Sequence, residues 1–462
     1  MIGIGLSAGK TTIQRATPWG TEHCMTRDEA EDLARRMAGK RISDWMTCMS
    51  LAAAYGILGH YELAITWASR AVMLDRNAST LFNLAFAYEM VGRFDKSFPL
   101  AQEALSLDLS NPFAGLLYAE GLLRKGNWLE GWPLYERYCW GEVWAELRDW
   151  RPEWRGPVSD VGSADIEVNV CATRGSFSGD IAGKRILILP PAQGCGDLIM
   201  LLRWCGELKK RGAYVIYTCS AMVEKLLEGH KWIDRLIVIG NSADSAETII
   251  LLDEFDCFAS LMSLPARFGA TPDTAPWDGP YIKAKYKIAL ARNGKPLVGL
   301  CSQAGETNDP RRIRSLSASQ AERLLAVDSV EWIGLDYGRQ PLIEDWNDTA
   351  ALIDCLDLVI SVDTGVMHLA GAMGKPTWVI LPVRSDAKFF LDRSDSPLYP
   401  SLRLFRSRRE TGMAGAVESV ISALEGIGNR EQGIGSAPRK LFPSSEGNGG
   451  TDSVPCNLSP VP

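Results

Sequence analysis

The chain has 462 residues, which at about 150 residues per domain predicts about three domains. Hydrophobic residues make up 46% and charged residues 23%, a globular composition that excludes wholesale disorder. The net charge of −7 argues against a protein that coats nucleic acid, because phosphate binding needs a basic surface. No apolar stretch approaches the roughly 18 residues that a membrane span needs.

Cysteine and histidine usage limits the compartment and the chemistry. The eleven Cys are odd in number and form no C-x-x-C pair, so we expect free thiols in a reducing cytoplasm. Residues 1–12 lack a basic region followed by a long apolar run, so we expect no signal peptide. Only four His occur, which argues against a His-rich metal site: His23, His60, His230 and His368.

Residues 45–140 contain three segments that repeat every 33 or 34 residues. In each, a small residue precedes a Gly by seven positions, and an aromatic residue follows that Gly by two. The positions are Ala52, Ala85 and Ala119, then Gly59, Gly92 and Gly126, then Tyr61, Phe94 and Trp128. The pattern resembles the tetratricopeptide repeat and predicts a solenoid of helix–turn–helix units, with an added helix near 27–39. Such a solenoid holds a partner or a neighbouring domain.

Six Trp lie between residues 128 and 154. We interpret them as an apolar seam that joins the solenoid to the following domain, with a sugar-stacking platform as the alternative.

From residue 184, short apolar runs alternate with helical patterns, which predicts parallel, doubly wound sheets. Strands are expected at 184–191, 213–219 and 234–240, and in a second series at 295–302, 330–336, 358–363 and 376–382. Helices are expected at 198–212, 222–229, 317–327, 349–357 and 365–374. The interval 253–283 is predicted to be rich in loops, with short elements. The fold class is therefore α + α/β, a helical solenoid followed by two Rossmann-like halves with a cleft between them.

The sequence predicts six parts. They are an N-terminal extension at 1–26, the solenoid at 27–156, a linker at 157–182, an N-terminal Rossmann-like half at 183–290, a C-terminal half at 291–426 and a disordered tail at 427–462.

The segment 358–382 carries the sharpest functional pattern. Its strand ends before Asp363, Thr364 and Gly365, and a helix then begins that carries His368. Backbone N–H groups at a helix start bind phosphate, and the Thr364 hydroxyl adds a further donor, so the segment predicts a diphosphate site. The alternative is structural, with Asp363 as an N-cap and His368 satisfied in the core.

The string S-V-D-T-G-V-M-H-L-A-G-A-M-G-K-P resembles the signature of glycosyltransferase family 9, the ADP-heptose:lipopolysaccharide heptosyltransferases. The whole chain resembles bacterial proteins that fuse tetratricopeptide repeats to such a domain. The resemblance implies a GT-B fold with a nucleotide-diphosphate sugar bound in the C-terminal half and the acceptor in the N-terminal half. It also implies inversion at the anomeric carbon, with no metal and no separate cofactor.

A second pattern is the loop P-P-A-Q-G-C-G-D, in which Gly194 and Gly196 precede Asp197. The resemblance implies that Asp197 is the general base, with the two glycines in a loop near the acceptor. An inverting transfer needs one base to take the proton of the attacking hydroxyl. N-capping of the helix is the alternative role for Asp197, because a helix start favours the ionised carboxylate and lowers its basicity.

A third pattern lies at 300–317, where Ser302, Asn308 and Arg314 align with the family loop that faces the donor. Residues 301–306 depart from the family pattern. If this loop supplies a cation to the leaving diphosphate, then Arg311, Arg312 or Arg314 must provide it. The alternative is an ordinary solvated Arg cluster.

These patterns predict a cytoplasmic glycosyltransferase with a glycan, lipid-linked or protein acceptor, and lipopolysaccharide biosynthesis is the best-known role of the family. We expect that the repeats can bind a protein partner. We expect neither nucleic-acid binding nor a transmembrane segment. The basic segment 403–409 is either solvated or touches anionic lipid at the inner face of the membrane. Two alternative functions remain: a scaffold with a degenerate transferase domain, prompted by the altered 301–306 loop, and a protein O-glycosyltransferase.

Overall fold

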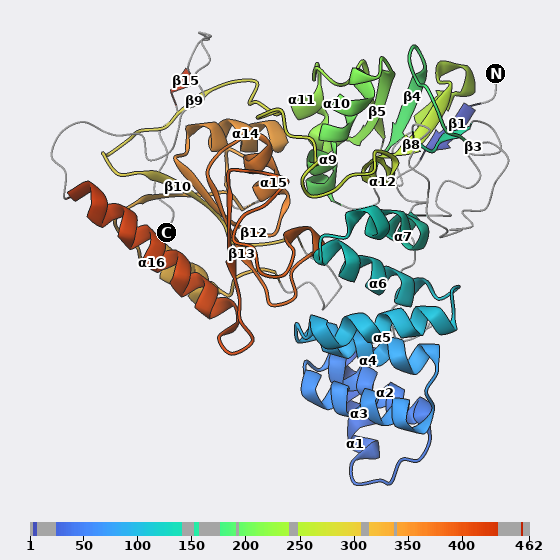
Figure 1. The fold of residues 1–462 in the computed structure, drawn as a ribbon. Helices are drawn as coiled ribbons and strands as arrows, with labels where there is room; N and C mark the ends of the chain where they lie inside the picture. The colour runs from blue at the N-terminus through green and yellow to red at the C-terminus, as the bar shows by residue number, and fades with distance from the viewer. Residues whose placement is uncertain are drawn as a thin grey trace.

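The structure is a computed structural model. It describes residues 3–6, 25–140, 152–156, 176–190, 194–239, 248–305, 314–336, 340–432 and 454–455. A column of paired helices leads into two α/β halves that lie side by side (Figure 1). The predicted fold class, a helical solenoid followed by two Rossmann-like halves, is confirmed.

The solenoid contains three helical pairs behind a leading helix. Its helices are α1 (Arg27–Met37), α2 (Trp45–Ile57), α3 (Tyr61–Leu74), α4 (Ala78–Met90), α5 (Phe94–Leu107), α6 (Pro112–Arg124) and α7 (Trp128–Trp140). The turn glycines Gly59, Gly92 and Gly126 have φ of +81°, +69° and +86°, a backbone region that other residues rarely adopt. The repeated glycine is therefore the residue that closes each pair.

The predicted apolar seam is present in the described residues. Trp128, Trp132 and Trp154 are buried in one hydrophobic cluster, which continues into both α/β halves. The seam therefore makes the last repeat part of the same core as the two halves.

The N-terminal half has a parallel six-stranded sheet of order β3-β2-β8-β4-β5-β6. Its strands are β2 (Glu153–Trp154), β3 (Ser176–Phe177), β4 (Arg185–Leu189), β5 (Tyr214–Ser220), β6 (Arg235–Ile239) and β8 (Cys257–Ser260). Its helical elements are α9 (Cys195–Leu201), α10 (Arg203–Lys210), α11 (Ala221–Leu227), α12 (Leu264–Arg267), η1 (Leu252–Glu254) and η2 (Leu261–Ser263).

Two boundaries predicted from sequence are wrong in this half. Residues 152–156, assigned to the solenoid, and 176–182, assigned to a linker, contain β2 and β3 of this sheet. The interval 253–283 contains β8, a fully buried central strand. At four residues, with helical turns on both sides, β8 is too short for periodicity to reveal.

The C-terminal half has a parallel five-stranded sheet of order β11-β10-β12-β13-β14. Its strands are β10 (Leu297–Cys301), β11 (Glu331–Gly334), β12 (Leu358–Val362), β13 (Thr377–Leu381) and β14 (Leu402–Arg406). Its helices are α13 (Ala318–Leu325), α14 (Trp346–Cys355), α15 (Gly365–Ala372), η4 (Ala387–Phe389) and α16 (Gly412–Gln432).

The C-terminal end of this half differs from the prediction. The helix α16 continues past residue 427, where the tail was predicted to begin, and it packs on β13 and β14. The basic segment at 403–409 begins inside the edge strand β14, where Leu404 and Phe405 are buried. Arg403 is exposed, whereas Arg406 turns inward and donates to backbone carbonyls, so the segment is not simply solvated.

Two short ladders complete the described strands. The strand β1 (Gly3–Leu6) pairs antiparallel with β7 (Thr248–Leu251), and β15 (Val454–Pro455) pairs parallel with β9 (Ile288–Ala289).

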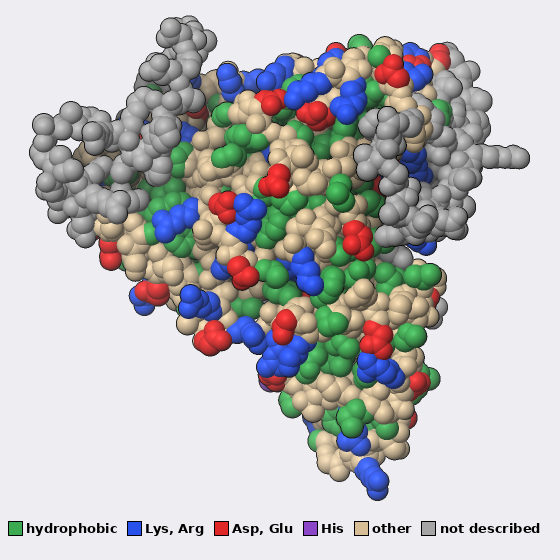
Figure 2. Space-filling view, viewed as in Figure 1, with side chains coloured by type: hydrophobic (Ala, Val, Ile, Leu, Met, Phe, Trp, Pro, Cys, Tyr) green, Lys and Arg blue, Asp and Glu red, His purple; other side chains and the backbone are tan. Residues whose placement is uncertain are grey.

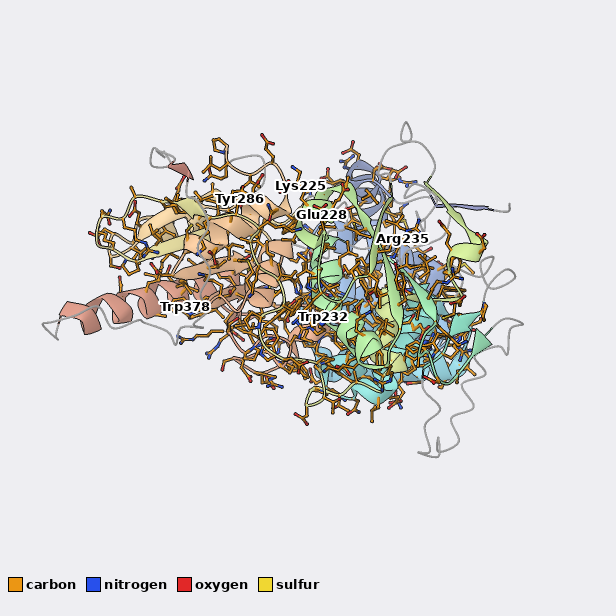
Figure 3. All side chains as sticks on the ribbon, turned by 90° about the horizontal axis from the view of Figure 1, so that it is seen from above. Lys225, Glu228, Trp232, Arg235, Tyr286 and Trp378 are labelled. Atoms are coloured by element: carbon orange, nitrogen blue, oxygen red, sulfur yellow. The ribbon has the colours of Figure 1, made fainter. Side chains whose placement is uncertain are left out.

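The two halves contact each other along α9 and α15, and along α11 and α14. Lys225 of α11 forms an ion pair with Asp345, the N-cap of α14, at 2.8 Å. Seen from above, Lys225 and Glu228 lie near Tyr286 at this junction (Figure 3), and the Tyr286 hydroxyl donates to Asp348 at 2.5 Å. The Lys225–Asp345 pair therefore ties α11 of the N-terminal half to α14 of the C-terminal half.

The surface carries both charge signs. On the face shown in Figure 2, Lys and Arg lie among Asp and Glu and form no continuous basic area. Within the described residues, no helix is both long enough and apolar enough to cross a membrane.

Candidate functional site

The strand order of the C-terminal sheet identifies the edge where a ligand binds. The strand β10 comes first in this half, yet it lies between β11 and β12. The chain therefore runs from β10 to one side and then crosses back to β12 on the other side, which makes a switch point. In open α/β sheets, ligands bind beyond the carboxyl ends of the strands at such a switch point. Cys301 ends β10 and is paired in register with Ser361 of β12. Ser302 and Asp363 therefore follow adjacent strand ends.

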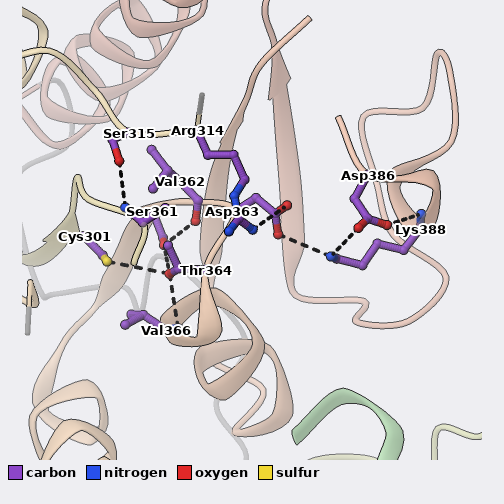
Figure 4. Close-up of polar contacts among 11 residues, drawn as sticks. Cys301, Arg314, Ser315, Ser361, Val362, Asp363, Thr364, Val366, Asp386 and Lys388 are labelled. Atoms are coloured by element: carbon purple, nitrogen blue, oxygen red, sulfur yellow. Dashed lines mark hydrogen bonds and ion pairs between the residues drawn. The ribbon is translucent and has the colours of Figure 1, made fainter. Parts of the chain in front are cut away.

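Asp363 lies at the centre of the polar cluster beyond these strands (Figure 4). Its carboxylate is buried and pairs with Arg314 Nη1 at 3.3 Å and with Lys388 Nζ at 3.4 Å. Lys388 also pairs with Asp386 at 3.4 Å. The Nε of Arg314 is buried and has no acceptor among the described residues, so this guanidinium retains a donor for a ligand.

The ammonium group of Lys388 also interacts with a carboxylate of the N-terminal half, that of Asp197. Burial acts to lower the pKa of Lys388, but the carboxylates of Asp363, Asp386 and Asp197 outweigh it, and the pKa is raised above its usual value. The side chain is therefore a cation at neutral pH. Two candidate residues from different halves, Asp197 and Asp363, thus act on one ammonium group.

Thr364, and not Asp363, caps helix α15. Its hydroxyl accepts from Val366 N at 3.2 Å and lies 3.4 Å from Ser361 Oγ and 3.7 Å from Cys301 Sγ. The alternative role of Asp363 as an N-cap is therefore wrong, because its carboxylate turns to Arg314 and Lys388.

His368 is buried beside Tyr399 of its own half and faces Gly196 of α9 in the other half. Its Nδ1 lies 3.1 Å from the Tyr399 hydroxyl. Burial, together with the charge of Lys388, holds the pKa of His368 well below its usual value, so the imidazole is neutral at pH 7. The ring can therefore offer one hydrogen-bond donor and one acceptor, but no charge.

The starts of α9 and α15 meet at the junction of the halves. A Cβ added to Gly196 would lie 2.9 Å from His368 Cδ2 and 3.3 Å from Gly365 Cα. A Cβ added to Gly194 would meet nothing within 4 Å. Asp197 is at the third position of α9 and Gly194 is the N-cap, so the N-cap alternative for Asp197 is also wrong.

Gly365 is required by packing on its other side. An added Cβ would lie 2.3 Å from Cη2 of Trp346 in α14. The close packing of Trp346 therefore gives a structural reason for glycine at this position.

Ser302 is held by a residue that the sequence reasoning missed. Asp336, just after β11, accepts from Ser302 Oγ at 2.7 Å and from the Ser302 and Gln303 backbone N–H groups, both at 2.9 Å. Ala304 N donates to Ser315 Oγ at 3.0 Å, which brings together the described residues on either side of 306–313. Asn308, Arg311 and Arg312 lie outside the described residues.

Lys388, Asp386, Tyr399 and Arg203 were also missed. Arg203 of α10 is buried and donates to the Leu398 carbonyl of the other half and to the Tyr281 hydroxyl at 3.1 Å. Arg203 lies in the stretch A-Q-G-C-G-D-L-I-M-L-L-R-W that resembles the family, but no role was assigned to it, and Lys388 belongs to no motif. The fold brings both near His368. Among the described residues, no group of three or more His, Cys, Asp and Glu could hold a metal ion.

Residues 345–385 match the family described as Glycosyltransferase family 9 (heptosyltransferase). This range holds Asp363, Thr364, Gly365 and His368, so the resemblance seen in the sequence is confirmed over the segment that carries the C-terminal part of the site.

The chain is also 24% identical over 266 residues to Protein FlbA of Caulobacter vibrioides. The match covers 49% of this chain and 44% of FlbA, so the chain spans less than half the length of this curated relative.

Three solved structures are similar at low identity. A glycosyltransferase family 9 protein of Veillonella parvula is 14% identical, with a TM-score of 0.39 over 54% of this chain and 99% of that one. The tetratricopeptide-repeat protein YrrB is 14% identical, with a TM-score of 0.22 over 30% and 75%. The O-GlcNAc transferase of Thermobaculum terrenum is 13% identical, with a TM-score of 0.30 over 92% and 91%. These TM-scores lie below 0.5, so the fold assignment rests on the strand orders and helical pairs.

Proposed function

We propose that the protein is a glycosyltransferase that moves a sugar from a nucleotide-diphosphate donor to a hydroxyl acceptor. The observation that carries this proposal is the meeting of α9 and α15, which sets Asp197 of one half near Lys388 and Asp363 of the other. The family match over 345–385 supports the same reaction class.

The donor diphosphate binds at the start of α15 in this proposal. The backbone N–H groups there and the cations Arg314 and Lys388 stabilise negative charge as the diphosphate leaves. Asp363 holds both cations, and neutral His368 donates or accepts one hydrogen bond near the same ligand. The chain itself supplies the positive charge that the leaving group needs, which supports transfer without a metal.

Asp197 takes the proton of the acceptor hydroxyl while that oxygen attacks the anomeric carbon. The attacking oxygen comes from the side opposite to the leaving diphosphate, so the proposed reaction inverts the anomeric configuration. The carboxylate belongs to α9, across the junction from α15, as an attack from the opposite side requires.

The test is a binding and turnover comparison with a panel of UDP-, GDP- and ADP-sugars. Wild type should bind one donor in calorimetry, and Asp363→Ala and His368→Ala should weaken that binding. Asp197→Asn should keep donor affinity within about twofold and lose at least about a hundredfold in turnover, as removal of a general base does. Equal donor affinity in all variants rejects the donor site, and unchanged turnover of Asp197→Asn rejects the base.

Acceptor and location follow as parts of the proposal. We propose a cytoplasmic enzyme acting on a glycan, lipid-linked or protein hydroxyl, with lipopolysaccharide synthesis as one family role. An intact-mass shift of co-expressed proteins would identify a protein acceptor. The scaffold alternative is weakened by one contact, because Arg384 of the C-terminal half already pairs with Glu89 and Glu120 of the repeats.

A further inference from the structure

The segment Val383–Phe390, which follows β13, lies between the solenoid and the polar cluster of the candidate site. Its helical turn η4 packs on α6 of the third repeat. The same turn carries Lys388, whose ammonium pairs with Asp363. In Figure 1 the solenoid reaches the C-terminal half through α6 and α7. One short segment therefore links the repeats to the site.

We propose that the turns of the second and third repeats position Lys388 for the donor diphosphate, with Gly92 and Trp128 as the positioning residues. The inference rests on the proposed function for its ligand, and on the contacts of Val383–Phe390 for its geometry. In this arrangement the solenoid is a structural part of the donor site, and its second and third repeats are held by the chain's own C-terminal half.

The turn glycines of the second and third repeats both face this segment. A Cβ on Gly92 would lie 2.6 Å from Val383 Cγ1, and one on Gly126 would lie 3.6 Å from Phe390 Cε1. A Cβ on Gly59 would meet nothing within 4 Å. Gly59 therefore does not meet the segment, whereas the next two turn glycines face it.

Buried charges fix the same surface. Arg124 and Glu89 form an ion pair of 2.9 Å with both side chains buried. Arg384 extends this pair, at 3.8 Å from Glu89 and 3.7 Å from Glu120. Partial burial raises the pKa of Glu120, and the charges of Arg384 and Arg124 oppose that rise. Withdrawal of Arg384 would therefore leave the half-buried Glu120 carboxyl without the stronger of its two opposing cations. Separation of the segment from the repeats would therefore cost free energy.

The backbone of the segment is strained next to the stacked ring. Phe390 has φ 60° and ψ −162°, a region that is nearly reserved for glycine. Its ring stacks on Trp128 at 5.8 Å between centroids, and Arg406 donates to the Phe389 and Phe390 carbonyls. Strained residues persist only where their surroundings hold them. Loss of the Trp128 ring would therefore release the segment that carries Lys388.

The test reads Lys388 directly, without any need for activity. The full chain is treated with an acylating reagent, and modification of Lys388 is followed by peptide mass spectrometry. Gly92→Ala and Gly59→Ala are a matched pair, because both positions have a positive φ and only Gly92 faces Val383. Trp128→Ala and Trp128→Phe form a second pair, of which the Phe variant keeps an aromatic stack. Affinity for UDP, GDP and ADP is measured on each protein, together with its melting temperature.

We expect Gly92→Ala and Trp128→Ala to speed Lys388 acylation at least about fivefold, the change that about 1 kcal/mol of local destabilisation produces. Both should also weaken nucleotide diphosphate binding, whereas Gly59→Ala and Trp128→Phe should stay near wild type. Equal acylation of Lys388 in all five proteins overturns the proposal, as does equal acceleration in Gly92→Ala and Gly59→Ala. If acylation changes as expected but wild type binds no nucleotide, the proposed function fails and the positioning stands.

Discussion

Substitution of Gly196 by Ala adds one methyl group where the two halves meet. The new Cβ would lie 2.9 Å from His368 Cδ2 and 3.3 Å from Gly365 Cα, whereas ordinary contacts begin at 3.4 Å. The imidazole ring of His368 cannot move far, because it is buried against Tyr399. The backbone at Gly365 cannot move far either, because Trp346 lies against its other side. The halves must therefore separate by a few tenths of an ångström.

We expect this overpacking to lower the free energy of unfolding by about 1–3 kcal/mol. The larger effect should be on turnover, because Asp197 moves away from the donor side. A misplacement of about 1 Å costs about a hundredfold in rate, so a smaller shift should cost about tenfold. Donor affinity should change little, since the groups proposed to bind the diphosphate all lie in the C-terminal half.

Gly194→Ala is the matched control, because its new Cβ would meet nothing within 4 Å. Chemical denaturation and steady-state turnover with saturating donor are measured on both variants. Gly194→Ala should stay within about 1 kcal/mol of wild type, the scale of an N-cap change. If Gly196→Ala keeps full turnover, or if both variants lose the same amount, the junction does not set the reacting geometry.

Three further predictions concern charge. Lys388→Gln should weaken nucleotide diphosphate binding in calorimetry about tenfold or more, which is about 1.4 kcal/mol. Lys388→Arg should recover most of that affinity, and equal binding by the Gln and Arg variants would contradict the role of the charge. Arg124→Met leaves Glu89 buried with the more distant Arg384 as its partner, so it should lower the free energy of unfolding by about 3–5 kcal/mol in chemical denaturation. The double variant with Glu89→Gln should lose clearly less, and additive losses would count against the ion pair. Because burial depresses the pKa of His368, the unfolded chain binds more protons than the folded chain below about pH 6.5, and stability is lost as the pH falls there. Between pH 6.5 and 5.5, wild type should lose up to about 1.4 kcal/mol more stability than His368→Gln, and parallel losses would refute the burial of a neutral imidazole.

The sequence predicted the architecture because its signals are local. Alternating apolar runs identified β4, β5, β10, β12 and β13, and the turn glycines identified the three repeats. The short strands β2 and β8 escaped, since two or four residues carry no period. Their identity as strands depends on pairing with residues far away in the chain.

The candidate site was predictable only where a motif carries it. Asp363, Thr364, Gly365 and His368 form one continuous string, so pattern alone places them together. Lys388 follows Asp363 by 25 residues in a stretch without a motif, and Asp336 comes earlier in the chain, just after β11. The parallel register of β10 with β11 brings Asp336 to Ser302, and η4, which follows β13, brings Lys388 to Asp363.

The central claim is that a nucleotide-diphosphate sugar binds where α9 and α15 meet. Hydrogen–deuterium exchange with each of the UDP-, GDP- and ADP-sugars tests it most directly, because it localises binding without any acceptor. For the donor that binds, peptides spanning Gly365–Ala372 and the Lys388 segment should be protected, and the repeats α2 and α3 should be unchanged. Protection confined to the solenoid, or no protection with any of the three sugar-nucleotide classes, would contradict the account.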